Sequence, residues 1–504
     1  MFKLKFAIFW QAADLLSTVA ALPQQSYLPS PLKVDFAARE LANTALPLDA
    51  QLIGLSIEFG NIVDFFGDVG SPNEYSRQLL ENVIDKGGKS PILRLGGNTQ
   101  DRSYFCEDCE RTMNNVYNGT GPKATEATLV TYNKKLFRLL QDNLDETQDF
   151  IFGLNFGTKN KTESQVALAG SVKYMDQARI YAYELGNEIN YYPLGYRSRN
   201  WTYVNYAQEQ LEWLTNLSET DPSASYQFGN IVGPPKDNPD FTFQRLASIG
   251  VPMNIPGVKI LATHAYPRNI CTPQDAAQAT MEYFLNHTST KEYVSRWQGE
   301  IVTAKANGYL FHVGEMSGVA CHGKKGLSDT HGALLWSIDF ALAGASLGMD
   351  RVFFHNGKGE FYYNMWEPTD SIAPNGTVTI QRQVRPLYYS TLFLTDLVHG
   401  ISKPKISSVS SLDAIDLANY AVFNHKGALK KMVVINTQVY EDTSLPRQAK
   451  ALDLRGAFGR RLRITRLTAP SVTSTSETTW AGQSTDASGR LRGEEITECS
   501  EDGL

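Results

Sequence analysis

The chain has 504 residues, of which 42% are hydrophobic and 20% are charged. This composition forms a globular core and excludes a disordered, collagen-like or coiled-coil protein. The length leaves open three domains of ordinary size or one large domain with a smaller one. The net charge is −6, so bulk charge attracts neither nucleic acid nor an anionic membrane.

The first 21 residues have the composition of a secretory signal peptide. A short basic start precedes an apolar stretch that ends in small residues, which predicts cleavage near Ala21. An amphipathic cap helix is the alternative. No later stretch has 18 consecutive apolar residues, so no membrane span is expected. We expect a secreted, extracellular protein, and six glycosylation sequons are compatible with that: Asn118, Asn160, Asn200, Asn216, Asn286 and Asn375.

Short apolar runs alternate with amphipathic runs between residues 50 and 385. The apolar runs predict eight strands, at residues 52–58, 91–95, 150–156, 180–185, 226–232, 258–264, 309–313 and 351–355. The intervening runs predict helices at residues 75–86, 128–143, 165–174, 203–217, 240–249, 275–305 and 330–347. Eight such units predict an α/β fold, a (β/α)8 TIM barrel.

The pattern changes after about residue 385. Helical spacing fades, and β-rich runs at residues 417–423, 431–436, 449–454 and 462–467 are separated by Ser/Thr-rich turns. This predicts an all-β sandwich domain over residues 386–504. Residues 30–49 precede the first barrel strand and are expected to add strands to that domain. Its expected role is to support one side of the barrel.

Five cysteines are spread along the chain. Cys106 and Cys109 form a Cys-x-x-Cys pair, and in a secreted protein we expect a local disulfide there rather than a redox motif. Cys271 and Cys321 are the candidates for a second bridge. A zinc site of four cysteines would need a second close pair, which the sequence lacks.

Two predicted strands end in the same way. The fourth is followed by Gly186, Asn187 and Glu188, and the seventh ends in Gly314 and Glu315. Barrel strands carry functional groups at their carboxyl ends, so these two carboxylates face each other across the barrel mouth. Glycoside cleavage needs such a pair, one as acid and one as nucleophile. The sequence shows no metal-ligand or nucleotide-loop spacing, so no metal and no cofactor are expected.

Four segments in this order resemble glycoside hydrolase family 79: residues 93–101, residues 186–188, residues 264–266 and residues 314–315. The family includes β-glucuronidases and heparanases, and the resemblance is strongest to the secreted fungal type. It implies a (β/α)8 retaining glycosidase with a C-terminal β-domain. It further implies that Glu188 is the general acid/base and Glu315 the nucleophile, which agrees with the chemistry of the pair.

The resemblance also implies substrate contacts. Asn187 resembles the residue that hydrogen-bonds the sugar 2-OH, and Tyr266 resembles the tyrosine that holds the nucleophile. His264 is either part of the site or a packed core residue, and Arg94 either braces a catalytic carboxylate or forms a structural ion pair. The remaining expected contacts are Glu58, Asn98 and Asp101 to sugar hydroxyls, and Tyr362 with the Gly359 N–H to a uronate carboxylate.

Together these features predict a retaining exo-β-glucuronidase. Its substrates would be glycoconjugates that end in β-linked glucuronic acid, with or without a 4-O-methyl group. The alternatives are an endo-acting heparanase-like enzyme, a neutral-sugar β-glycosidase of the same clan, and a non-catalytic carbohydrate-binding protein on the same fold. The expected partner is a glucuronic acid-containing glycan, not nucleic acid.

Overall fold

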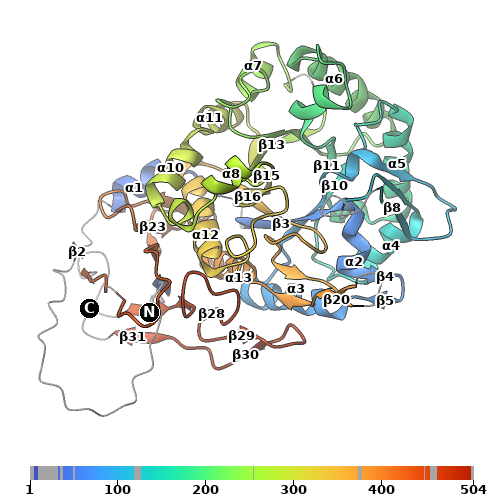
Figure 1. Ribbon diagram of the computed structural model, residues 1–504. Helices are drawn as coiled ribbons and strands as arrows, with labels where there is room; N and C mark the ends of the chain where they lie inside the picture. The colour runs from blue at the N-terminus through green and yellow to red at the C-terminus, as the bar shows by residue number, and fades with distance from the viewer. Residues whose placement is uncertain are drawn as a thin grey trace, which may run out of the picture.

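The computed structural model describes residues 5–8, 32–33, 38–48, 51–118, 126–253, 255–372, 377–447, 449–453 and 462–500. Eight parallel strands close into a barrel, which confirms the predicted fold (Figure 1). In chain order the barrel strands are β3 (Ile53–Glu58), β6 (Ile92–Gly96), β10 (Phe150–Leu154), β11 (Ile180–Leu185), β12 (Tyr226–Val232), β13 (Val258–Ala265), β15 (Leu310–Met316) and β17 (Arg351–Asn356).

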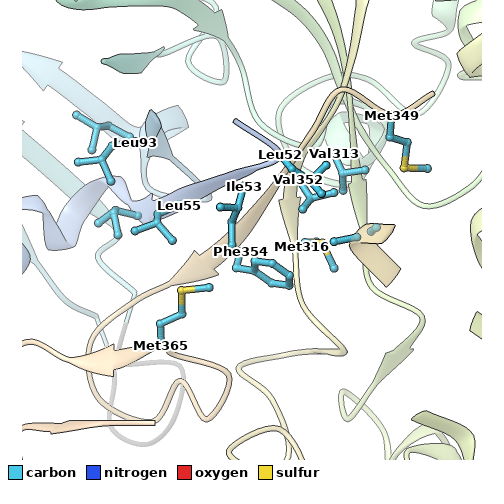
Figure 2. Close-up of a cluster of buried hydrophobic side chains, with 14 of the residues drawn as sticks. Leu52, Ile53, Leu55, Leu93, Val313, Met316, Met349, Val352, Phe354 and Met365 are labelled. Atoms are coloured by element: carbon cyan, nitrogen blue, oxygen red, sulfur yellow. The ribbon is translucent and has the colours of Figure 1, made fainter. Parts of the chain in front are cut away.

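Side chains along the barrel strands point alternately into the barrel and toward the surrounding helices. Ile92 and Ala182 belong to a small apolar cluster contributed by five barrel strands. Arg94 and Glu184 lie two residues further along the same strands, so they share that inward face nearer the carboxyl ends. The opposite faces of the strands join the main core, which includes Leu55, Val352 and Phe354 (Figure 2). The barrel is therefore apolar at one end and charged at the other.

The barrel helices begin where Asn or Thr side chains can cap them. The side chains of Asn73, Asn133, Asn160 and Thr330, for example, accept hydrogen bonds from backbone N–H groups of the first turn. The main helices are α3 (Glu74–Gly87), α4 (Lys134–Asp142), α5 (Lys161–Tyr174), α6 (Tyr203–Thr220), α7 (Phe243–Ser248), α11 (Gln298–Ala306), α12 (His331–Leu347) and α13 (Tyr388–Val398), with α2 (Ile62–Phe66) after β3.

Three helix predictions need correction. The run at residues 128–143 begins as strand β9 (Leu129–Tyr132), and only its second part is helical. The run at residues 275–305 is divided by the capping residues Thr280 and Asn286. It forms α8 (Pro273–Gln278), α9 (Met281–Phe284), α10 (His287–Ser295) and α11. Finally, α13 follows residue 385, where helical spacing was expected to end, and packs against α3 and α12 as the eighth barrel helix.

Two insertions rise from the carboxyl ends of the barrel strands. After β6, the strands β7 (Ser103–Phe105), β8 (Met113–Val116) and β9 form a small sheet. After β13 and β15, the strands β14 (Arg268–Asn269) and β16 (Val319–Ala320) pair with each other. The predicted disulfides Cys106–Cys109 and Cys271–Cys321 are both present, one in each insertion, which confirms them. Cys499 is free and exposed.

The C-terminal region contains a six-stranded sheet that lies beside the barrel (Figure 1). Its strand order is β22 (Lys405–Ser408), β23 (Leu417–Phe423), β24 (Leu429–Asn436), β1 (Lys5–Ile8), β26 (Leu462–Thr465) and β31 (Glu498–Ser500). Smaller two-stranded pairs complete the fold: β2 (Leu32–Lys33) with β25 (Leu452–Asp453), β4 (Gly67–Asp68) with β5 (Ser71–Pro72), β18 (Trp366–Glu367) with β21 (Gln383–Val384), β19 (Ser371–Ile372) with β20 (Val378–Ile380), β27 (Leu467–Thr468) with β28 (Thr479–Trp480), and β29 (Ser484–Thr485) with β30 (Leu491–Arg492).

The six-stranded sheet buries both of its faces. Tyr420 and Val422 belong to the core that the sheet shares with the barrel. Ala421 and Phe423 alternate with them and join a second core under α1 (Ala38–Thr44). Because β-strand side chains alternate between faces, this pattern places the sheet between the barrel helices and α1.

The predicted signal peptide lies mostly outside the described residues. Lys5–Ile8 form β1, which pairs in parallel with β24 and β26 inside the sheet. In the described part of the chain, none of the helices has the length and apolar character needed to cross a membrane.

Candidate active site

Glu188 stands on a strained turn directly after β11. Gly186 has φ 84° and Glu188 has φ 47°, a left-handed conformation that glutamate rarely adopts. Asn230 holds the turn by donating a hydrogen bond from Nδ2 to the Gly186 carbonyl at 2.9 Å. Glu188 then precedes the short helix η5 (Ile189–Leu194). Strain of this kind persists where surrounding contacts fix it, often at functional sites.

Glu315 lies near the carboxyl end of β15, and its side chain is only 7% exposed. One carboxylate oxygen accepts a hydrogen bond from Arg94 at 2.5 Å, and the other accepts one from the Tyr266 hydroxyl at 2.7 Å. Carboxylate oxygens of Glu188 and Glu315 and a ring nitrogen of His264 all lie within 4.8 Å of one another. The two predicted catalytic carboxylates therefore occupy one site.

The two carboxylates have opposite pKa shifts. Burial and the nearby charge of Glu315 raise the pKa of Glu188 to about 8. Burial alone would also raise the pKa of Glu315, but His355, His264, Arg94 and the Tyr266 hydrogen bond outweigh it and hold that pKa well below its usual range. At neutral pH the site thus holds one protonated and one ionised carboxyl group.

Arg94 connects these groups from beneath. Its guanidinium is fully buried and donates to Glu184 at 2.5 Å, to Glu315, and to the side-chain oxygen of Asn187 at 2.8 Å. Both interpretations of Arg94 therefore hold: it braces Glu315 and also forms a structural ion pair. Glu184 was not among the residues predicted from the sequence, although a charged residue inside an otherwise apolar strand is itself a signal of a buried partner.

His264 lies beside Glu188. Its Nδ1 is 3.3 Å from a Glu188 carboxylate oxygen, and the ring is fully buried. Burial lowers the pKa of His264 to about 4, so the ring is neutral at pH 7. It can orient Glu188 by a hydrogen bond, and its burial is equally that of a packed core residue.

Asn187 and Asn98 form a polar edge beside the acid. Asn187 Nδ2 donates to Asn98 Oδ1 at 3.2 Å, and Asn98 is exposed. The position of both is compatible with the predicted contacts to sugar hydroxyls.

Asp101 does not have the predicted role. It is 1% exposed, and its carboxylate accepts hydrogen bonds from the Tyr192 hydroxyl at 2.6 Å and from the backbone N–H groups of residues 156, 157 and 187. With its acceptors occupied, Asp101 fixes the turn that carries Glu188 rather than contacting a sugar.

Glu58 is similarly buried. It accepts two hydrogen bonds from Thr99, from the backbone N–H at 2.8 Å and from the hydroxyl at 2.5 Å. Its other oxygen lies 3.4 Å from Nε2 of His355. The charges of Glu315 and Glu58 outweigh burial and raise the pKa of His355. Glu58 therefore supports the site through His355.

The loop after β17 differs most from the prediction. Glu367, buried beneath this loop, accepts hydrogen bonds from Asn364 Nδ2 at 3.0 Å and from Arg385 at 2.7 Å. Tyr362 faces Arg385, whose guanidinium lies 5.7 Å from the ring centre. The neighbouring residue Tyr363 is the one in the site, with its ring 6.3 Å from that of Tyr266.

Sequence could not choose between two adjacent tyrosines of an irregular loop. His355, by contrast, could have been found from its place at the end of the eighth strand, the criterion that pointed to Glu188 and Glu315.

The Glu188, His264 and Glu315 group also has the donor atoms of a metal site. Both oxygens of Glu315 already accept hydrogen bonds, one from the permanently charged Arg94. A cation bound there would have to displace the guanidinium and bear its repulsion. The arrangement therefore suits proton transfer and nucleophilic attack better than metal binding.

Comparisons with known proteins agree with this fold. Residues 419–504 match the glycosyl hydrolase family 79 C-terminal beta domain. A beta-glucuronidase from Neurospora crassa is 27% identical over 440 residues, which are 79% of this chain and 74% of that protein. A beta-glucuronidase from Aspergillus niger is 27% identical over 432 residues, 82% of this chain and 76% of its own length.

Solved structures share the architecture. A 4-O-alpha-L-rhamnosyl-beta-D-glucuronidase from Fusarium oxysporum 12S superposes with a TM-score of 0.72 at 20% identity, covering 90% of this chain and 92% of its own. A family 51 alpha-L-arabinofuranosidase from Bifidobacterium longum gives a TM-score of 0.51 at 10% identity, covering 91% and 92%. The expected resemblance to glycoside hydrolase family 79 is thus confirmed, and the chain is a glycoside hydrolase.

Proposed function

We propose that this enzyme is a retaining exo-β-glucuronidase in which Glu188 is the acid/base and Glu315 the nucleophile. The observation that carries the proposal is the carboxylate pair itself. One oxygen of each carboxylate lies within 4.8 Å of the other, and the two groups have opposite pKa shifts. Retaining pairs are about 5–5.5 Å apart, whereas inverting pairs are wider to admit a water molecule.

The reaction follows from the protonation states. Ionised Glu315 attacks the anomeric carbon while Glu188 gives its proton to the glycosidic oxygen, so that bond breaks and the aglycone leaves. The ester on Glu315 has no charge, so the repulsion that kept Glu188 protonated is gone. Glu188 then takes a proton from water, the water oxygen attacks the anomeric carbon, and Glu315 leaves as a carboxylate.

The neighbouring residues hold this geometry. Arg94 and Tyr266 each bind one oxygen of Glu315 and stabilise the carboxylate that departs in the second step. His264 orients Glu188 without adding a charge, because its ring is neutral at pH 7. Asn187, fixed by Arg94, is placed to meet the sugar beside the acid.

The choice of a glucuronide rests on the relatives, since both curated relatives are beta-glucuronidases. Tyr363 replaces Tyr362 as our candidate for the uronate carboxylate, because its ring lies 6.3 Å from that of Tyr266, whose hydroxyl binds Glu315. The proposed substrate is a glycan with terminal β-linked glucuronic acid, with or without a 4-O-methyl group.

Matched nitrophenyl β-glucuronide and β-glucoside test the proposal. We expect a strong preference for the glucuronide, measured as the ratio of kcat/KM values. A preference for the glucoside would be compatible with the roles of Glu188 and Glu315 but would contradict recognition of a uronate carboxylate. Binding of glucuronides without turnover of either compound would favour a non-catalytic protein.

Secretion is part of the proposal and is supported by the two disulfides, which form in oxidising compartments. Cleavage near Ala21 would remove Lys5–Ile8 from the sheet, where they lie between β24 and β26. N-terminal sequencing of protein from culture medium tests the prediction. A mature N-terminus near residue 22 supports it, and one at residue 1 contradicts it.

A further inference from the structure

One hydrogen bond joins two distant loops over the barrel mouth. His322 Nε2 lies 3.0 Å from a carboxylate oxygen of Glu126, although the two residues are 196 positions apart. Glu126 precedes β9 in the insertion after β6, and His322 follows β16 in the insertion after β15. We call this Glu126–His322 contact the mouth bridge.

Both ends of the mouth bridge are anchored. The His322 ring stacks on Phe361 at 4.1 Å, and the preceding residue, Cys321, is tied to Cys271 by the disulfide. Glu126 accepts hydrogen bonds from Asn98 Nδ2 at 3.2 and 3.3 Å. The side chains are thus held in place and are not free surface groups.

The barrel order shows what the mouth bridge covers. β17 and β3 stand between β15 and β6 in the closed sheet, so the bridge passes over the ends of those two strands. His355 and Glu58 lie at these ends, 3.4 Å apart. Glu188 follows β11, on the other side of the barrel.

The position of Glu188 orients the substrate. The general acid contacts the glycosidic oxygen, so the aglycone leaves on its side, past the exposed Tyr191 of η5. The sugar ring extends from the anomeric carbon toward the opposite strands, β17 and β3. A further sugar at the non-reducing end would therefore meet the mouth bridge.

We propose that the Glu126–His322 mouth bridge is the wall that limits this enzyme to terminal sugars. It closes the glycone side of the pocket and offers polar contacts to the ring hydroxyl farthest from the cleaved bond. A glycosyl group on that hydroxyl, at O4 of a glucuronide, is excluded. This inference rests on the proposed function and specifies its exo action.

The test compares nitrophenyl β-glucuronide with the same compound carrying a further sugar at O4. We expect Glu126→Ala and His322→Ala to raise the kcat/KM ratio of the extended to the terminal substrate at least about tenfold, as the loss of a steric barrier does. Glu126→Gln keeps a hydrogen-bond acceptor and should keep the wild-type ratio. Glu110→Ala, at an exposed position of the same insertion, is the matched control.

Folding of each variant is checked by thermal unfolding, and each kcat/KM ratio is taken on folded protein. If both alanine variants keep the wild-type ratio of kcat/KM on the extended and the terminal substrate, the proposed role of the mouth bridge is wrong. Failure of the proposed function looks different, because the wild-type enzyme would then prefer the glucoside. In that case the same variants are compared on nitrophenyl β-glucoside and β-cellobioside, and the ratio again decides the inference.

Discussion

Two buried ionic clusters in this molecule have opposite designs. The catalytic cluster contains Arg94, Glu184, Glu188, Glu315 and His355 inside the barrel mouth. The interdomain cluster joins α10 and α12 to the six-stranded sheet region. It contains His287, Lys291, Asp339, Asp413 and Tyr420.

The interdomain cluster is balanced. His287 lies 2.9 Å from Asp339 and 3.2 Å from Asp413, and Lys291 lies 2.9 Å from Asp413. Burial would lower the pKa of His287, but the two aspartates outweigh it and raise that pKa to about 9. Two acids thus face two cations at neutral pH.

With Glu58, which lies 3.4 Å from His355, the catalytic cluster has four carboxyl groups for Arg94 and His355. It compensates for the excess by leaving a proton on Glu188, whose pKa is about 8. The comparison shows what charge balance changes. The balanced interdomain cluster is a structural contact between two parts of the fold, whereas the excess of carboxyl groups in the catalytic cluster keeps one of them protonated at neutral pH.

The largest effect is expected from Glu315→Gln. The amide cannot attack the anomeric carbon, so kcat should fall at least about a thousandfold. Thermal unfolding should change little, because Glu184 still pairs with Arg94. Substantial residual turnover of an aryl glycoside by pure protein would remove Glu315 from the nucleophile role.

Glu188→Gln should have a graded effect. General acid catalysis contributes about 10²–10⁴-fold, and a good leaving group needs less of it. We expect a large loss of kcat/KM on a natural glycan and a smaller loss on a nitrophenyl glycoside. Equal losses on the two substrates would contradict the acid role.

The pH dependence of kcat/KM reports the ionisation of Glu188. Glu188 acts in its protonated form, and its pKa is raised to about 8, so activity should be retained at neutral pH and fall as the pH rises through about 8. In Glu188→Gln this alkaline limb should disappear. An alkaline limb that persists unchanged in the variant must belong to another group.

A substitution in the interdomain cluster should instead lower the stability of the fold. Asp339→Asn leaves the buried His287 cation with one acid instead of two, which should destabilise the fold by about 3 kcal/mol without changing the kcat of folded protein. Chemical unfolding gives the free energy, and initial rates give kcat. If Asp339→Asn has wild-type stability, the interdomain cluster does not stabilise the contact between the two parts of the fold.

The sign of the pH effect follows from the raised pKa of His287. Its contribution to stability is fully present below its ordinary pKa of 6.5 and is lost as the pH rises through about 9. Unfolding free energies measured at pH 6 and pH 9.5 should therefore differ more in the wild type than in Asp339→Asn.

Lys291→Met should have the smallest effect. Lys291 is 35% exposed, and an exposed ion pair contributes less than about 1 kcal/mol. Asp413 keeps His287 as a partner in the variant. A loss as large as that in Asp339→Asn would mean that Lys291, not His287, balances the cluster.

Sequence predicted the parts of the fold that depend on local pattern. All eight barrel strands were found because each is a short apolar run buried on both faces. Glu188 and Glu315 were found because a Gly before a strand-end carboxylate is a local signal. The prediction failed at α13, which is almost wholly buried and so lacks the polar face that marks a surface helix.

The remaining errors at the site concern tertiary partners. Asp101 is of a suitable type in a suitable loop, but the Tyr192 hydroxyl and three backbone N–H groups already occupy its carboxylate. The interdomain cluster and the mouth bridge join residues 52 to 196 positions apart in sequence. Pairings of that kind are set by the closed fold, not by any local pattern.

The division of roles between the two carboxylates is tested most directly by trapping the intermediate. A 2-deoxy-2-fluoro-glucuronosyl fluoride should form a glycosyl ester that turns over slowly, and mass spectrometry of peptides locates it. The account predicts one sugar per chain, attached to Glu315. An ester on Glu188, or inactivation without any ester, would contradict it.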